Sequence, residues 1–161
     1  MKSLYKSFNF ETILNQIPKW TWKELYYAIK NGIINCNDVI YYAKYSVNES
    51  SNDLVYQLCL LEESEKIYNI LKRLSEFELE ETEYIKNKWI FAILLYFYKN
   101  KNKYSDPLSM VEEVYVDFDY PDSIRNLIRY MPVDDDSKYG DAEIYIKWKK
   151  YIINNFKLYA E

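Results

Sequence analysis

The stretch of sequence that decides the fold is WTWKELYYAIKNG, residues 20–32. Thr21 and Glu24 have the spacing of a capping box, in which each side chain accepts a hydrogen bond from the other residue's backbone N–H. Gly32 stands where a residue in the left-handed conformation closes many helices. The stretch therefore predicts an α-helix whose two ends are both defined by local sequence.

The apolar residues of this stretch have helical spacing. Trp22, Leu25 and Ile29 follow the pattern i, i+3, i+7, which places them on one face of a helix. Trp20 and Leu25 are placed to form a hydrophobic staple across the start of the helix. The segment thus predicts an amphipathic helix that buries one face.

Most of the remaining chain repeats this helical period. Further helices are expected at residues 38–45, from Leu54 onward, at 67–77, 80–99 and 107–118, between Pro121 and Pro132, and at 141–159. No run of alternating polarity long enough for a strand is present, except that residues 114–118 fit a strand and a helix equally well. The connections are short. We therefore predict an all-α fold, a single compact irregular bundle of about seven to nine helices, forming one domain over residues 1–161.

Three features favour a protein of the reducing cytoplasm. The longest apolar run, Trp89 to Tyr98, has ten residues, whereas a membrane-spanning helix needs about 20. The N-terminal segment is interrupted by polar residues where a signal peptide would be apolar. Cys36 and Cys59 lack the spacing of a metal or redox motif, so we interpret both as reduced thiols packed among apolar groups.

Composition excludes several classes of enzyme. The chain contains no histidine, the commonest general base and a usual zinc ligand. Its only glycines are Gly32 and Gly140, so no glycine-rich loop is available to hold a phosphate or a dinucleotide. We expect no cofactor and no catalytic residue.

The charge balance indicates the kind of partner. The formal net charge is −4, which disfavours binding to nucleic acid because affinity for a phosphate backbone comes mainly from Lys and Arg. The one basic cluster, Lys147 to Lys150 with Lys157, is too small to change that expectation. A basic protein partner is favoured, and neither a nucleic acid nor a membrane is expected to bind.

Two acidic segments are the candidate binding residues. The first comprises Glu112, Glu113, Asp117, Asp119 and Asp122, and the second comprises Asp134, Asp135 and Asp136. The first could contact a partner, act as solvated or helix-capping charge, or bind Mg²⁺, which takes oxygen ligands. The second is a self-repelling loop that stays solvated unless a cationic surface meets it. Elsewhere in the chain tyrosines stand in adjacent pairs, Tyr26 with Tyr27 and Tyr41 with Tyr42, that cannot all face one core, so some must be exposed, as in protein interfaces.

Several short strings carry a family resemblance. The sequence is DFDYP at residues 117–121 and RYMP at 129–132, preceded by PLSMVEE at 107–113 and TWKEL at 21–25. With these strings the chain resembles a bacterial family of small proteins called domain of unknown function 2247. That family has no established active site, so the resemblance implies a context and assigns no residue a role.

The context implied is that of immunity proteins, small partners that are often encoded beside secreted toxins and protect the producing cell. We therefore expect an immunity-type protein that occludes a cationic toxin domain, such as a nuclease, with its acidic and tyrosine side chains. One alternative is a Mg²⁺- or Mn²⁺-dependent enzyme that uses Glu112, Asp117 and Asp119. Another is a structural subunit of a homo-oligomer.

Overall fold

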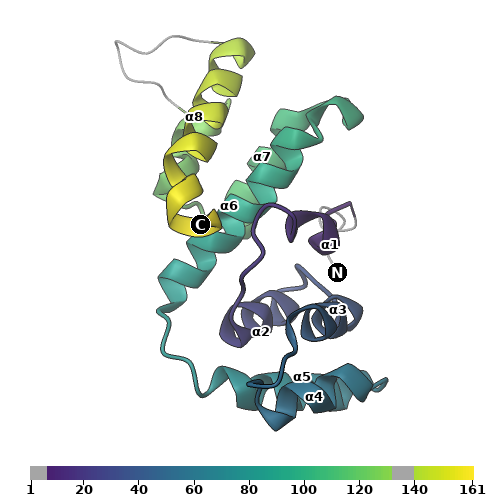
Figure 1. Cartoon of the computed structure of the whole chain (residues 1–161). Helices are drawn as coiled ribbons and strands as arrows, with labels where there is room; N and C mark the ends of the chain where they lie inside the picture. Colours follow the sequence, from purple (N-terminus) through teal and green to yellow (C-terminus); the bar gives the residue numbers. More distant parts are fainter. Residues whose placement is uncertain (1–6, 132–139) are drawn as a thin grey trace. The chain divides into compact units, whose positions relative to one another are not determined.

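The structure is a computed structural model, and it describes residues 7–131 and 140–161. Within these residues the chain is helical and contains no strand, so the predicted all-α class is confirmed. The helices are α1 (Phe10–Ile13), α2 (Trp22–Lys30), α3 (Cys36–Ser46), α4 (Asp53–Leu60), α5 (Ser64–Ser75), α6 (Thr82–Lys99), the 3₁₀ helix η2 (Lys101–Lys103), α7 (Pro107–Asp117), the 3₁₀ helix η3 (Asp122–Leu127) and α8 (Asp141–Ala160) (Figure 1).

The chain divides into two compact units, Met1–Ile85 and Lys86–Glu161. They are called unit 1 and unit 2 below. Helix α6 begins in unit 1 and continues into unit 2. The prediction that residues 1–161 form one domain stays a prediction.

Unit 1 is built around α2, and its start confirms the predicted capping box. The Thr21 backbone N–H donates to Glu24 Oε1 at 2.9 Å, and the Glu24 N–H donates to Thr21 Oγ1 at 3.1 Å. Helix α2 packs against α5, and α3 packs against α4. Leu25 and Ala28 of α2 are fully buried, as are Val39, Ala43, Leu58 and Leu71 of the neighbouring helices.

The end of α2 also matches the prediction. Gly32 has a φ of 71°. Its N–H donates to the Ile29 carbonyl at 3.3 Å, and the Ile33 N–H reaches back to the Ala28 carbonyl at 2.9 Å. These two bonds form a Schellman motif, which turns the chain sharply and is most readily adopted by glycine.

Unit 2 has the central part of α6 as its core. Every residue from Trp89 to Leu95 is at most 2% exposed, so the longest apolar run is a buried helix. From α8, Tyr151 and Tyr159 place their rings 6.2 and 5.4 Å from that of Phe91. Within residues 7–131 and 140–161, no helix is long and apolar enough to cross a bilayer.

Four details of the sequence prediction need correction. Phe77 was expected to extend the buried stripe of its helix, but α5 ends at Ser75 and Phe77 is 71% exposed. Helix α3 starts at Cys36 rather than Asp38, because Asn35 and Asp38 form a second capping box. The segment after Pro121 is a short 3₁₀ helix, closed by bonds between residues three apart, and the possible strand at 114–118 is the end of α7 and the turn that follows it.

The remaining core predictions agree with the structure in part, since Ile29 of the predicted buried face of α2 is only partly buried. Trp20, Trp89 and Trp148 are buried, and Trp22 is half-buried. Cys36 and Cys59 are free thiols and partly buried.

Candidate functional site

Helix α7 lies beside the segment Arg129 to Met131 of unit 2, which begins the RYMP string. Its apolar positions Leu108, Val111, Val114 and Tyr115 are buried, as the sequence pattern requires. It packs against η3, whose Ile124 and Leu127 are buried and which itself packs on α8. This packing leaves the side of α7 that carries Glu112 next to the segment that follows η3.

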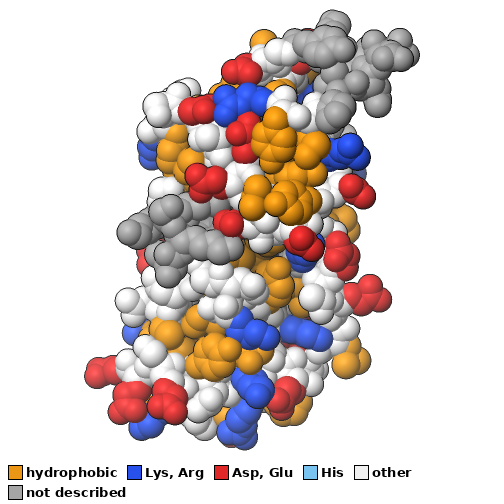
Figure 2. Space-filling model, turned by 180° about the vertical axis from the view of Figure 1, so that it is seen from behind, with side chains coloured by type: hydrophobic (Ala, Val, Ile, Leu, Met, Phe, Trp, Pro, Cys, Tyr) orange, Lys and Arg blue, Asp and Glu red, His pale blue; other side chains and the backbone are white. Residues whose placement is uncertain are grey.

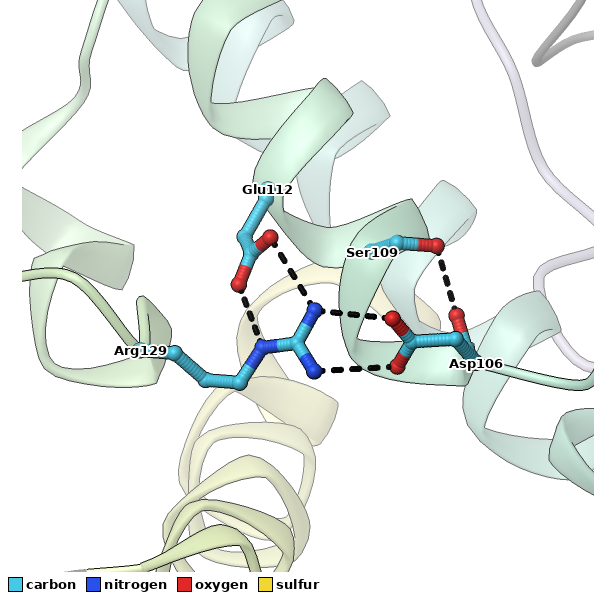
Figure 3. A network of polar contacts seen from close by, with 4 residues as sticks. All are labelled: Asp106, Ser109, Glu112 and Arg129. Atoms are coloured by element: carbon cyan, nitrogen blue, oxygen red, sulfur yellow. Dashed lines mark hydrogen bonds and ion pairs between the residues drawn. The ribbon is translucent and has the colours of Figure 1, made fainter.

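A single arginine joins that segment to two carboxylates of α7 and its N-cap. Arg129 Nε and Nη2 lie 2.6 and 3.2 Å from the two carboxylate oxygens of Glu112. Nη1 and Nη2 lie 3.2 and 2.9 Å from those of Asp106. Figure 3 shows the guanidinium between the two acids, with each carboxylate engaged by two N–H groups. Such bidentate pairs have a defined geometry as well as opposite charge.

This network determines the charge of the guanidinium. The hydrogen bonds that Arg129 donates to Glu112 and to Asp106 raise its pKa above the ordinary value, so the guanidinium stays charged. Asp106 is the N-cap residue of α7, but its side chain makes no capping bond and is engaged by Arg129 instead. Ser109 donates a hydrogen bond to the Asp106 carbonyl at 2.6 Å, at the first turn of the helix.

The backbone after α7 is strained at the DFDYP string. The Asp119 N–H donates to the Val116 carbonyl at 3.1 Å, and the Tyr120 N–H donates to the Tyr115 carbonyl at 2.8 Å. This is the same Schellman motif that ends α2, with Asp119 in the position of the glycine. Asp119 has a φ of 61° and Tyr120 a φ of 56°. A left-handed conformation costs about 1 kcal/mol or more for each residue with a side chain.

Two exposed tyrosines accompany this strained turn. Tyr120 is 54% exposed, and its ring packs edge-on against that of the buried Tyr115, with the centroids 5.4 Å apart. Tyr130 is 58% exposed and follows Arg129 directly. Partial desolvation and then the charge of Glu112 raise the pKa of Tyr130, as do Tyr115 and Tyr120, so these groups are close in space.

The predicted acidic residues differ in their surroundings. Glu112 belongs to the arginine network. Glu113, Asp119 and Asp122 are exposed and form no ion pair with any described residue, while Asp117 is partly buried. Asp134, Asp135 and Asp136 lie outside the described residues.

The acids of α7 and its flanks do not form a metal site in this geometry. Among residues 7–131 and 140–161, no group of three or more acidic or cysteine side chains is placed to hold a metal ion. Glu112, Asp117 and Asp119, the proposed ligands of the enzyme alternative, are therefore not gathered around one point.

We use the name acidic tyrosine face for six residues of unit 2 that lie on α7, in the turn after it, in η3 and in the segment that follows η3: Glu112, Glu113, Asp119, Tyr120, Asp122 and Tyr130. Sequence reasoning identified its acids but gave no role to Tyr120 or Tyr130. The signal for both tyrosines was present in the DFDYP and RYMP strings, which come together here. On the face of the molecule visible in Figure 2, hydrophobic side chains lie next to acidic and basic ones.

Comparison with known proteins gives a family. The model of a family described as an uncharacterized protein conserved in bacteria, DUF2247, matches residues 10–155. The chain belongs to this family. The family resemblance found in the sequence is thus confirmed, and the match includes both tyrosine strings and the capping box of α2. No curated protein and no solved structure gives a match.

Proposed function

We propose that this protein is an immunity-type binding protein of the bacterial cytoplasm, which occludes a cationic toxin domain with the acidic tyrosine face. The observation that carries the proposal is a set of exposed acids together with two exposed tyrosines, of which Tyr120 lies on a strained turn and Tyr130 in the segment after η3. In this proposal the protein performs no chemistry. It protects the producing cell by covering the toxin's active surface.

Charge favours a basic partner. Between residues 106 and 129 there are six acidic residues and two arginines, and no lysine. One of these arginines, Arg129, is already engaged by Glu112 and Asp106. The excess negative charge is therefore available to a partner, where complementary charge speeds association and selects against wrong partners.

The tyrosines favour a protein partner over a free ion. Tyrosine is enriched at interfaces because one ring buries a large area while its hydroxyl can still form a hydrogen bond. Tyr120 is held by the Schellman bonds and by contact with Tyr115, so less conformational freedom would be lost when it binds. Backbone strain, as at Asp119 and Tyr120, is typical of functional segments.

The triple aspartate at 134–136 is a second element of this proposal and rests on the sequence alone. Its charge would extend the acidic surface toward a cationic partner. The enzyme alternative receives no such support. Its central carboxylate, Glu112, is bound by Arg129, and a carboxylate in a bidentate ion pair is a poor general base or metal ligand.

The proposal is tested by coexpression with the toxin domain encoded beside this protein's gene. We expect the protein to restore growth and to copurify with the toxin. Reversing Glu113 and Asp122 to lysine should abolish rescue while the variant still folds, as judged by circular dichroism. The proposal fails if the wild-type protein neither rescues growth nor binds any protein encoded next to it.

A further inference from the structure

Unit 1 contains an open pocket of about 350 Å³ that the proposed function does not use. It lies where the start of α2, the middle and end of α3, the start of α4 and the segment after α5 meet. Its size falls within the range of small-ligand sites, about 300–1,000 Å³. Four aromatic residues line it, namely Trp20, Trp22, Tyr42 and Phe77, together with the carboxylate of Glu78.

The aromatic walls are held in place by their own contacts. The Tyr42 hydroxyl donates to the Trp20 carbonyl at 2.8 Å and accepts from the Trp20 N–H at 2.9 Å. Trp20 Nε1 donates to the Ile17 carbonyl at 2.8 Å. The rings of Trp22 and Tyr42 meet edge to face, with centroids 5.5 Å apart. The polar atoms of Trp20 and Tyr42 are thus paired with backbone, and the pocket is formed without a ligand.

Phe77 forms the exposed side of this pocket. It is 71% exposed, although it follows a helix whose apolar residues are otherwise largely buried. A phenylalanine at the rim adds an aromatic surface that no described helix covers. Its position explains why it departs from the buried stripe that the sequence predicted.

The charge at the pocket is negative. The Glu78 carboxylate accepts a hydrogen bond from the Lys23 N–H at 2.7 Å, and Thr21 donates to Glu80. Burial raises the pKa of Glu78, and the neighbouring charge of Glu80 raises it further. Burial also raises the pKa of Tyr42, and the charges of Glu24 and Glu78 add to that effect.

These carboxylates determine whether the pocket favours an anionic or a cationic ligand. They already occupy the backbone N–H groups at the start of α2, where an anion would otherwise bind. The nearby cation, Lys23, directs its ammonium toward the Glu78 carbonyl at 3.4 Å. An anion would therefore meet repulsion, whereas a cation over aromatic rings is attracted by both the ring faces and the carboxylates.

We propose that this pocket binds an organic cation that carries N–H donors, an alkylguanidinium or alkylammonium group. The aromatic rings hold the cation and its alkyl stem, and the Glu78 carboxylate accepts a hydrogen bond from it. Ser46, whose hydroxyl donates to the Tyr42 carbonyl at 2.8 Å, has an acceptor lone pair left at the pocket wall. This site is independent of the acidic tyrosine face, which belongs to unit 2.

The test is an NMR titration of the full chain with n-butylguanidinium and with n-butylurea, its neutral isostere. We expect n-butylguanidinium to shift the indole N–H signal of Trp22, with a Kd on the order of 1 mM for a ligand of this size. n-Butylurea should bind at least about fivefold more weakly, because a cation–π contact and a charged hydrogen bond are lost. Equal binding of the two compounds would overturn the proposal.

Two variants locate the site, and a third variant is the matched control. Glu78→Gln keeps an acceptor for the Lys23 N–H and removes the charge, and Phe77→Ala removes an exposed ring without opening the core. Each of these two variants should bind n-butylguanidinium at least about threefold more weakly than the wild-type protein. Glu62→Gln, at an exposed acid outside the pocket, should leave its affinity unchanged. Unchanged affinity in both pocket variants would refute the site.

A peptide with one arginine between glycines separates the two sources of such a cation. Tighter binding of the peptide than of n-butylguanidinium assigns the pocket to an arginine side chain of a polypeptide. Equal or weaker binding assigns it to a free small cation. If neither compound shifts any signal of the pocket, the inference is wrong, whereas the proposed toxin complex would stand or fall on its own test.

Discussion

Replacing Arg129 by alanine should destabilise the protein measurably, although the residue lies at the surface. The change removes two bidentate ion pairs at once, with Glu112 and with Asp106. The Glu112 side chain is only 20% exposed, against 48% for Asp106, so the pair with Glu112 is less screened by solvent. Exposed pairs contribute up to about 1 kcal/mol each, and ideal bidentate geometry places a pair at the upper end of that range.

The expected loss is about 1–2 kcal/mol in the free energy of unfolding, most of it from the pair with Glu112. For a chain of this length, each kcal/mol lowers the Tm by about 2–4 °C. Arg125 is the matched control, because it is an exposed arginine of the preceding turn that forms no ion pair among the described residues. Arg125→Ala should change stability by less than about 0.5 kcal/mol.

The assay is urea unfolding followed by circular dichroism, with a double-mutant cycle between Arg129→Ala and Glu112→Ala. We expect a coupling energy near 1 kcal/mol, which 1 M NaCl should reduce because salt screens partly exposed charges. Arg129→Lys should recover less than half of the loss, since an ammonium cannot engage both carboxylates in bidentate fashion. If Arg129→Ala costs no more than Arg125→Ala, the network does not hold α7 to the RYMP segment.

Three further outcomes follow from the structure. Asp119→Gly should stabilise the protein by about 0.5–1 kcal/mol in chemical denaturation, because glycine adopts the left-handed conformation without strain. Gly32→Ala should destabilise it by a similar amount for the same reason. A loss of stability in Asp119→Gly would contradict the assigned strain. Thr21→Ala should cost about 1–2 kcal/mol through the lost capping box, and Thr21→Ser should restore most of it; equal melting temperatures of the two variants would show that the cap is unimportant. The raised pKa of Glu78 means that the folded protein binds a proton on this carboxyl more readily than the unfolded chain does. The protonated carboxyl therefore stabilises the fold below pH 4.5, the ordinary pKa, and this stabilisation is lost as the pH rises through the folded pKa. Glu78→Gln should reduce that loss, and an unchanged pH profile of the Tm in the variant would argue against the raised pKa.

Helix starts and ends were predictable where the signals are local. The capping box of α2 and Gly32 lie within the sequence that they shape, so their spacing was sufficient to predict both ends. The buried face of α7 followed from helical period for the same reason, whereas the burial of α6 followed from its unbroken apolar run. The second capping box at Asn35 was missed although its spacing is equally local, because its third residue is aspartate rather than the more usual glutamate or glutamine.

The candidate site was less predictable, because it depends on residues that are distant in sequence. Asp106 and Arg129 are 23 positions apart, and only the packing of η3 against α7 brings them together. Helical period placed Glu112 beside the apolar stripe but could not name its partner. The left-handed Asp119 and Tyr120 carry no glycine signal, so the turn was interpreted as ordinary acidic residues before Pro121.

The binding of this protein to the toxin domain encoded beside its gene, measured by isothermal titration calorimetry, tests the central claim most directly. The account predicts a 1:1 complex that Glu113→Lys with Asp122→Lys weakens at least about tenfold. Glu49→Lys with Glu62→Lys, which reverses two exposed acids of unit 1 and changes the net charge equally, should weaken it less than about threefold. Absence of binding by the wild-type protein, or equal losses in the two variants, would contradict the claim that the acidic tyrosine face occludes a cationic toxin.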